Sequence, residues 1–471
     1  MLTTLTAPAF AGTWYIEDGD ITISAGESGN NVTQNENTTE NDPDTIITNR
    51  EEGASSHTVT IDAKDKDDKV EVTLKDVNID ASSRSEAAVS VTGKGDTTIE
   101  LDGDNELKSG AGHAGLEHNK TDTSGELTIQ DKDKNGSLEA AGGFKGAGIG
   151  SAGSNDAQVK ITGGNITATS DDWGAGIGSG SYGTGTVEIT GGEINATGGY
   201  LGAGIGGGIY GLSNVTIEGN TKVNATGGAG GAAIGGGAGA ENNSDNNGNQ
   251  ITIKSNENGS PTINAVGGGT DEGEEIVIGG AGIGAGCESD ADADITLEGK
   301  VTITATAGKD NVAIGANGIE QEFSGLAEGS SITRYDSEGN DTSLPGDKVP
   351  VTPVVPDDTS SGGSADASVQ ESVFPGLVVT DKDGQRISYT SIRGNNVLSL
   401  RVGRFTASLR ASLATLRQLR AEGIDTITFQ TILRSTTLSV DELLAMGGED
   451  AEVVLTHHIR SSTLTVGGKA V

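Results

Sequence analysis

The chain has 471 residues, of which 76 are glycine and only 3% are aromatic. So few large side chains exclude an ordinary globular core, and the formal net charge of −38 makes nucleic acid and anionic membrane surfaces unfavourable partners. The sequence contains no run of 18 apolar residues, so we expect no membrane span.

The first residues are similar to the end of a secretory signal. Ala9-Phe10-Ala11 matches an A-x-A cleavage pattern, so residues 1–11 are interpreted as a residual signal peptide and the protein as extracellular, secreted or associated with the cell surface. No charged segment precedes the apolar residues, and a short disordered tail is the alternative interpretation.

Residues 12–335 carry an internal repeat. Its clearest phrase, Gly-Ala-Gly-Ile-Gly, occurs at 146–150, 174–178, 202–206 and 280–284. Each copy follows two short runs in which apolar and polar residues alternate. Three short alternating runs in a unit of about 28 residues predict three strands per unit, each paired with its copy in the next unit.

The expected fold is therefore all-β: a right-handed parallel β-helix, or solenoid, followed by a small α+β domain. The polar stretch Glu241–Gln250 is expected to be a loop. Aligning the units places eight apolar residues in one column, one for each coil of a minimum stack: Val89, Leu116, Ile149, Ile177, Ile205, Ile234, Ile283 and Ile314.

Five aromatic residues lie close to the glycine phrases. Phe144, Trp173 and Tyr200 precede a phrase by one or two residues, and Tyr182 and Tyr210 follow its isoleucine by five. In stacked coils they would form two rows flanking a glycine strand whose outward positions have no side chain. Flat aromatic faces beside a bare floor suit the apolar faces of sugar rings, which predicts polysaccharide binding. Alternatively, the rings cover exposed sheet backbone.

A second candidate site is a metal loop. Asp131, Asp133 and Asn135 have the spacing of oxygen ligands for calcium, with Gly136 at the turn. Position 12 of this loop is Gly142 rather than the bidentate Glu of an EF-hand, and a polar turn between strands is the alternative.

Threonine and asparagine also recur at outward positions of the second run. Regular threonine arrays of this kind are similar to those of ice-binding solenoids, and ladders of β-branched residues also simply stabilise sheets. The two ladders are Thr167, Asn195, Asn224, Asn264 and Thr304, and Thr169, Thr197, Thr226 and Thr306.

The composition changes after residue 335. Residues 336–370 are rich in Pro, Ser and Gly and predict a linker, and 371–471 predict a small α+β domain. In this domain Thr406–Ala421 has the period of an amphipathic helix. A solvated helix face is the preferred interpretation of its arginines, and contact with an anionic cell-wall polymer or a protein partner is the alternative. Strands are expected at Thr426–Phe429, Ser435–Val440, Val453–Thr456 and Ser462–Val466.

Several segments resemble a known family. Thr73–Asp80, Ile99–Leu107 and Gly136–Ala140 look like secreted Gram-positive bacterial β-helix proteins described as carbohydrate-binding-domain proteins, which are related in fold to pectate-lyase-like polysaccharide lyases. The likeness covers roughly Val59 to Gly150. It implies cell-surface binding of plant-type polysaccharide, with calcium in some members.

Catalysis is not expected. Lyases of this fold use clustered Asp residues with calcium and a Lys or Arg base, whereas Arg50, Arg84 and Arg334 are the only arginines before the linker and lie in no recurrent acidic pattern. The sequence thus predicts a non-catalytic polysaccharide-binding protein. The alternative function is a structural or adhesive surface spacer with a protein ligand or none.

Overall fold

The computed structural model describes residues 12–242, 248–269 and 278–350, and the C-terminal part from 377 to 470 apart from 382–384, 388, 394–395, 403, 405, 422, 432–433, 449–450 and 459–460. The chain divides into two compact units, Met1–Val355 and Pro356–Val471. The predicted signal peptide, residues 1–11, lies outside the described residues. In the described segments, no helix is long and apolar enough to cross a membrane.

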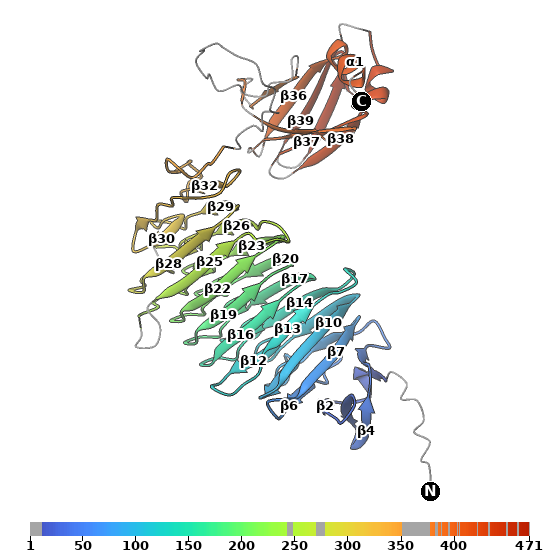
Figure 1. Ribbon diagram of the computed structural model, residues 1–471, viewed down its shortest axis with the longest axis vertical. Helices are drawn as coiled ribbons and strands as arrows, with labels where there is room; N and C mark the ends of the chain where they lie inside the picture. The colour runs from blue at the N-terminus through green and yellow to red at the C-terminus, as the bar shows by residue number, and fades with distance from the viewer. Residues whose placement is uncertain are drawn as a thin grey trace, which may run out of the picture. The chain divides into compact units, whose positions relative to one another are not determined.

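The first unit is a parallel β-helix, as the repeat predicts (Figure 1). Each strand pairs in parallel with its copy in the next coil, so the strands form three columns. The first column contains β1 (Thr13–Tyr15), β5 (Thr45–Thr48), β7 (Lys69–Lys75), β10 (Asp96–Asp102), β13 (Leu127–Gln130), β16 (Asp156–Ile161), β19 (Gly185–Ile189), β22 (Ser213–Glu218), β25 (Asn249–Lys254) and β28 (Ala293–Glu298). The second contains β8 (Asn78–Asp80), β11 (Asp104–Lys108), β14 (Ser137–Gly142), β17 (Asn165–Ser170), β20 (Gly192–Thr197), β23 (Thr221–Thr226), β26 (Thr262–Val266), β29 (Thr302–Thr306) and β32 (Ser331–Tyr335). The third contains β2 (Ile21–Ala25), β6 (Val59–Ala63), β9 (Val89–Gly93), β12 (Leu116–Lys120), β15 (Ile149–Gly150), β18 (Ile177–Gly178), β21 (Ile205–Gly206), β24 (Ile234–Gly235), β27 (Ile283–Gly284) and β30 (Ile314–Ala316).

The stacking register follows the predicted alignment. Leu116 pairs with Val89 on one side and Ile149 on the other, and isoleucine then lies over isoleucine in every later coil. The same column continues towards the N-terminus through Val59 and Ile21, beyond the eight coils expected. Because alternate strand residues point inward, the apolar side chains of all three columns form one continuous core.

The prediction that the glycine strand forms an exposed surface without side chains is wrong. In every described Gly-Ala-Gly-Ile-Gly copy all five residues are buried. A Cβ atom on Gly176 would lie 2.7 Å from the carbonyl oxygens of Gly204 and Thr197, so this strand packs directly against the backbone of the next coil. The chain then folds back over its own edge, where the Ala175 N–H donates to the Ser179 carbonyl at 3.0 Å. Glycine is needed here for close packing rather than for an open surface.

Antiparallel strands close both ends of the stack. At the N-terminal end, after the 3-10 turn η1 (Ile16–Asp18), β2 pairs with β3 (Asn30–Gln34), which pairs with β4 (Asn37–Asp42). At the C-terminal end β30 pairs with β31 (Ile319–Glu320). Such pairing protects the ends of a sheet from joining other chains.

The predicted linker, 336–370, begins inside the first unit. Residues 336–350 return along β32, where the Thr342 N–H donates to the Arg334 carbonyl and the Val349 N–H to the Ser330 carbonyl. The rest of the predicted linker, 351–370, lies outside the described residues.

In its described residues, the second unit is a small domain of two sheets and two short helices. Its strands are antiparallel neighbours except for β35 and β37, which run parallel. One sheet contains β33 (Leu377–Thr380), β36 (Ala407–Ser412), β39 (Glu452–His457), β40 (Ser462–Val466) and β41 (Lys469–Ala470); the other contains β34 (Thr390–Arg393), β35 (Val397–Arg401), β37 (Thr426–Gln430) and β38 (Ser435–Ser439); the helices are α1 (Leu413–Ala421) and α2 (Val440–Leu444).

The helix predicted for Thr406–Ala421 is partly wrong, since its first half is strand β36. Ala407, Leu409 and Ala411 are buried and alternate with polar residues, which is the period of a strand. Leu409 also fits the helical spacing of Leu413, so the sequence alone did not distinguish a strand from a helix at residues 407–412. Pairing of β36 with β33 and β39 decided the outcome.

Candidate functional site at the aromatic corner

The five predicted aromatic residues lie on consecutive coils of the β-helix, and four of them form two ring pairs. The rings of Phe144 and Trp173 have centroids 4.9 Å apart and are tilted by 48°. Those of Tyr182 and Tyr210 are stacked, with centroids 5.0 Å apart and an interplanar angle of 24°. Tyr182 is 57% exposed, Tyr210 49% and Phe144 38%, so apolar ring surface is available to a ligand.

Backbone hydrogen bonds hold the two pairs on the same corner of the coil. The Ser181 N–H, next to Tyr182, donates to the Lys145 carbonyl at 3.0 Å. One coil further, the Ile209 N–H, next to Tyr210, donates to the Trp173 carbonyl at 2.8 Å. The turn before one glycine phrase therefore lies directly beside the turn that follows the glycine phrase of the next coil. We call the surface formed by Phe144, Trp173, Tyr182, Tyr210 and Lys145 the aromatic corner.

In the predicted row of Phe144, Trp173 and Tyr200, the ring of Trp173 contacts that of Phe144, but its backbone is offset by one residue. Ala141 pairs with Thr169, and Ile149 pairs with Ile177, both with an offset of 28 residues; the next coil repeats this offset. Phe144, Asp172 and Tyr200 therefore share one row, and Trp173 lies one place further on, level with Lys145.

Asp172 is thus a carboxyl group between two aromatic positions, and sequence reasoning missed it. Burial raises its pKa, and the charge of the adjacent Asp171 raises it further. Aligning the coils on Ile149 and Ile177 and reading across to position 172 would have found it.

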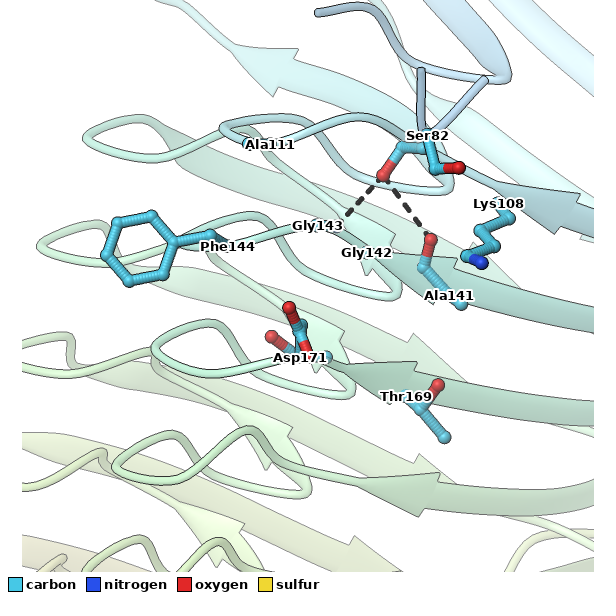
Figure 2. Close-up of a pocket in the computed structure, with 11 residues that line it drawn as sticks. Ser82, Lys108, Ala111, Ala141, Gly142, Gly143, Phe144, Thr169 and Asp171 are labelled. Carbon is cyan, nitrogen blue, oxygen red and sulfur yellow. Dashed lines mark hydrogen bonds between the residues drawn. The ribbon is translucent and has the colours of Figure 1, made fainter. Parts of the chain in front are cut away.

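A groove of about 550 Å³ adjoins this row (Figure 2). In this view Phe144 projects from its turn on one side, and Lys108 and Thr169 lie at the strand ends on the other. Its floor is fixed because the Ser109 hydroxyl donates to the Ala141 carbonyl at 3.3 Å and accepts from the Gly143 N–H at 3.0 Å. Ser82, Ser170 and Asp171 add further polar groups to the lining. The groove therefore combines one aromatic wall with hydroxyl, carboxylate and ammonium groups.

The positive charges at this corner already have partners. The Lys145 ammonium lies 4.9 Å from the Trp173 ring centroid and 5.3 Å from that of Phe144, within cation–π range of both. The Lys108 ammonium lies 3.6 Å from the Asp80 carboxylate. One side of the Phe144–Trp173 pair is therefore occupied by the chain's own cation.

Tyr182 and Tyr210 have an unusual backbone. Their φ angles are +65° and +59°, and the equivalent residue of the next coil is Gly239 at +68°. Tyr210 lies over this glycine, because a Cβ atom on Gly239 would be 2.6 Å from the tyrosine ring. A left-handed conformation costs a non-glycine residue about 1–2 kcal/mol. Tyrosine is therefore kept where glycine would be less strained.

Two of the three proposed calcium ligands, Asp131 and Asn135, make hydrogen bonds to other groups of the chain. The Asp131 carboxylate accepts hydrogen bonds from the Asn135 N–H at 3.2 Å and the Gly136 N–H at 3.1 Å. The Asn135 side chain turns away to donate to Asp102 at 3.1 Å, and Asp133 is exposed. Among the residues that the structure describes, no group of three His, Cys, Asp or Glu side chains is placed to hold a metal.

His118 and Cys287 are buried side chains of the β-helix. Buried His118 has a pKa lowered by burial, and its Nδ1 lies 3.0 Å from the Gln158 carbonyl. The buried thiol of Cys287 has a pKa raised to about 11, mainly by burial.

The fold and this surface define a parallel β-solenoid with an exposed aromatic corner. Comparisons of the chain with protein-family models, with curated proteins and with solved structures find no match.

Proposed function

We propose that the protein is a secreted or surface-associated, non-catalytic β-helix that binds polysaccharide through the aromatic corner and the adjoining groove. This is the activity implied by the Gram-positive carbohydrate-binding-domain family that its N-terminal coils resemble. The glycine strand is buried and takes no part, so the ligand contacts rings and polar side chains instead.

The stacked tyrosines are the observation that carries the proposal. Two residues in a left-handed backbone cost about 2–4 kcal/mol together, whereas an aromatic pair returns about 0.5–1.5 kcal/mol beyond its buried area. Stacking by itself does not offset the strain, and half of each ring still faces solvent. Strain kept at an exposed aromatic pair is typical of a binding surface.

The groove supplies the second kind of contact that sugars need. Sugar rings present apolar faces to aromatic side chains and hydroxyl groups to hydrogen-bonding partners. In the groove, Phe144 provides an aromatic face, and Ser82, Ser170 and Asp171 provide hydrogen-bonding groups. No residue here is assigned to bond cleavage.

The test replaces both tyrosines by glycine. Tyr182→Gly/Tyr210→Gly removes the rings and relieves the backbone strain, so we expect polysaccharide retention to be lost while thermal stability is unchanged or increased. Retention is measured by pulldown on insoluble polysaccharides and on a glycan array, and stability by the unfolding midpoint. Trp173→Ala tests the other ring pair of the corner, and Tyr200→Ala tests the aromatic residue in the same backbone row as Phe144.

Ser154→Gly is the matched control, because Ser154 has the same left-handed backbone, with φ of +64°, but no ring. It should bind like the unmodified protein. Full retention by the double glycine variant would refute the aromatic corner. If the unmodified protein retains no glycan at all, the adhesive or structural spacer is the better interpretation.

A further inference from the structure

We infer that the binding surface continues from the groove along the outward face of the β8–β32 column, as an uncharged strip that holds an extended, uncharged glycan. The inference rests on the proposed function and adds the chemical class of the polymer and its direction. The residues of the strip are aligned by the backbone pairing of β17, β20, β23, β26 and β29.

The strip consists of two outward rows that run across these five strands. All ten side chains are partly or fully exposed, and none is ionisable. One row is Thr167, Asn195, Asn224, Asn264 and Thr304, and the other is Thr169, Thr197, Thr226, Val266 and Thr306.

Absence of charge on this strip is unusual for this chain, which has 68 acidic and 30 basic residues. Charge does occur beside the strip, where Glu193 and Lys222 form an ion pair in the third outward row of these strands. On the first column, in the same coils, ion pairs lie within two of the outward rows: Lys160 pairs with Glu188 at 3.2 Å and Lys254 with Glu218 at 3.0 Å. A stable outward β-ladder in this molecule therefore does not need uncharged residues. Stabilisation of the sheet accounts for threonine, but not for the exclusion of charge from both rows.

The strip begins where the groove ends. Thr169 both lines the groove and starts the second row. In the preceding strand β14 the first row is occupied by Glu139 instead, so the charge-free surface starts at this coil. At the far end the second row continues from Thr306 to Tyr335, a partly exposed aromatic residue on β32. The strip is thus bounded by an aromatic groove at one end and a tyrosine at the other.

The dimensions suit a linear polymer lying along the stacking direction. Neighbouring strands are about 4.8 Å apart, so the five steps from β17 to β32 span roughly 24 Å. The groove covers the coils of β8, β11, β14 and β17, which adds about 14 Å. One coil is comparable in length with one sugar unit, so hydroxyl and amide groups recur along the strip at about the spacing of the sugars.

The chemistry of the strip favours an uncharged ligand. Threonine hydroxyls and asparagine amides both donate and accept hydrogen bonds, which matches sugar hydroxyls. A polyanion would find no cation in the two rows, and Lys222 in the neighbouring row is paired with Glu193, so the polyanion would meet mainly the field of a chain with net charge −38. The Asn224 amide already donates to Asn195 at 3.0 Å, so this pair is held in place before a ligand arrives.

The experiment compares Thr226→Lys and Thr226→Glu with the unmodified full-length protein. The probes are mixed-linkage β-glucan, its trisaccharide, and polygalacturonate as an anionic polymer. For an uncharged ligand on the strip, both variants lose about tenfold or more in affinity for β-glucan, because either charge must be desolvated beneath the polymer. Affinity for the trisaccharide, which fits the groove alone, stays unchanged.

Thr252→Lys is the matched control, because Thr252 lies on β25 in the outward row of the first column, between Thr216 and Thr296. It should leave β-glucan binding intact. The inference is overturned if the Thr226 variants bind β-glucan like the unmodified protein, or if Thr226→Lys gains affinity for polygalacturonate as the preferred ligand. If the unmodified protein binds none of the three probes and no other glycan, it is the proposed function that fails.

Discussion

At the scale of single residues, Tyr182 and Tyr210 are unfavourable for folding in two ways. Their backbone favours glycine, and their exposed rings gain little from burial. Ser154 and Gly239 in the same position of neighbouring coils show that the turn itself does not need an aromatic side chain. Spacing in the sequence predicted that these residues lie near the glycine phrases, but their backbone strain and stacking became visible only in the structure.

Asp131 allows a prediction that separates a metal ligand from a turn residue. Asp131→Ala removes two acceptors from backbone N–H groups, so we expect the unfolding free energy to fall by about 1–2 kcal/mol. The loss should be the same in EDTA and in millimolar calcium, as measured by urea unfolding. Asp133→Ala, which changes an exposed side chain, is the control and should be nearly neutral. A loss that appears only in calcium would establish the calcium loop.

At the scale of elements, the short third strand explains why glycine dominates this chain. Strands such as β18 have only two paired residues, and their backbone lies against the backbone of the next coil. The sequence predicted the position of this strand, because its isoleucine repeats. Its surroundings could not be predicted, since both an open floor and a tight backbone contact select for glycine.

Gly176→Ala tests this close packing. The new Cβ atom would lie 2.7 Å from two carbonyl oxygens, and neither belongs to a flexible side chain. We expect a loss of about 2 kcal/mol or more in unfolding free energy, although alanine is otherwise the less flexible residue. Chemical denaturation measures the loss.

Gly53→Ala provides the comparison, because a Cβ atom there would meet nothing within 4 Å. This variant should be neutral or slightly stabilising. Equal stability of the two variants would contradict the explanation that glycine is needed here for close backbone packing.

At the scale of the whole molecule, a stack of coils needs closed ends. Beyond the last coil the Arg334 guanidinium is completely buried and donates to both oxygens of Asp347, at 2.8 and 3.1 Å, and to Glu320 at 2.5 Å. These three groups tie β32 to β31 and to the segment that follows β32. The sequence does not reveal this role of Arg334, because its partners lie 13 and 14 residues away in segments without repeat character.

Arg334→Met should destabilise the β-helix by about 3–5 kcal/mol, because it leaves Asp347 buried without its partner. Arg50→Met is the control. Arg50 also makes two hydrogen bonds to one aspartate, Asp18, but the pair is half exposed, so its removal should hardly move the unfolding midpoint. If both variants unfold at the same denaturant concentration, the buried cluster does not hold the end of the stack.

The sequence by itself determined the parallel β-helix, the stacking column from Val89 to Ile314 and the position of the aromatic residues. It could do so because a repeat turns each position into a row, and period-two runs define which side chains point inward. Only the tertiary structure decided the burial of the glycine strand, the stacking of Tyr182 on Tyr210 in a left-handed backbone, and the strand at β36. These features depend on which backbone lies against which, and a local pattern of residue types does not contain that information.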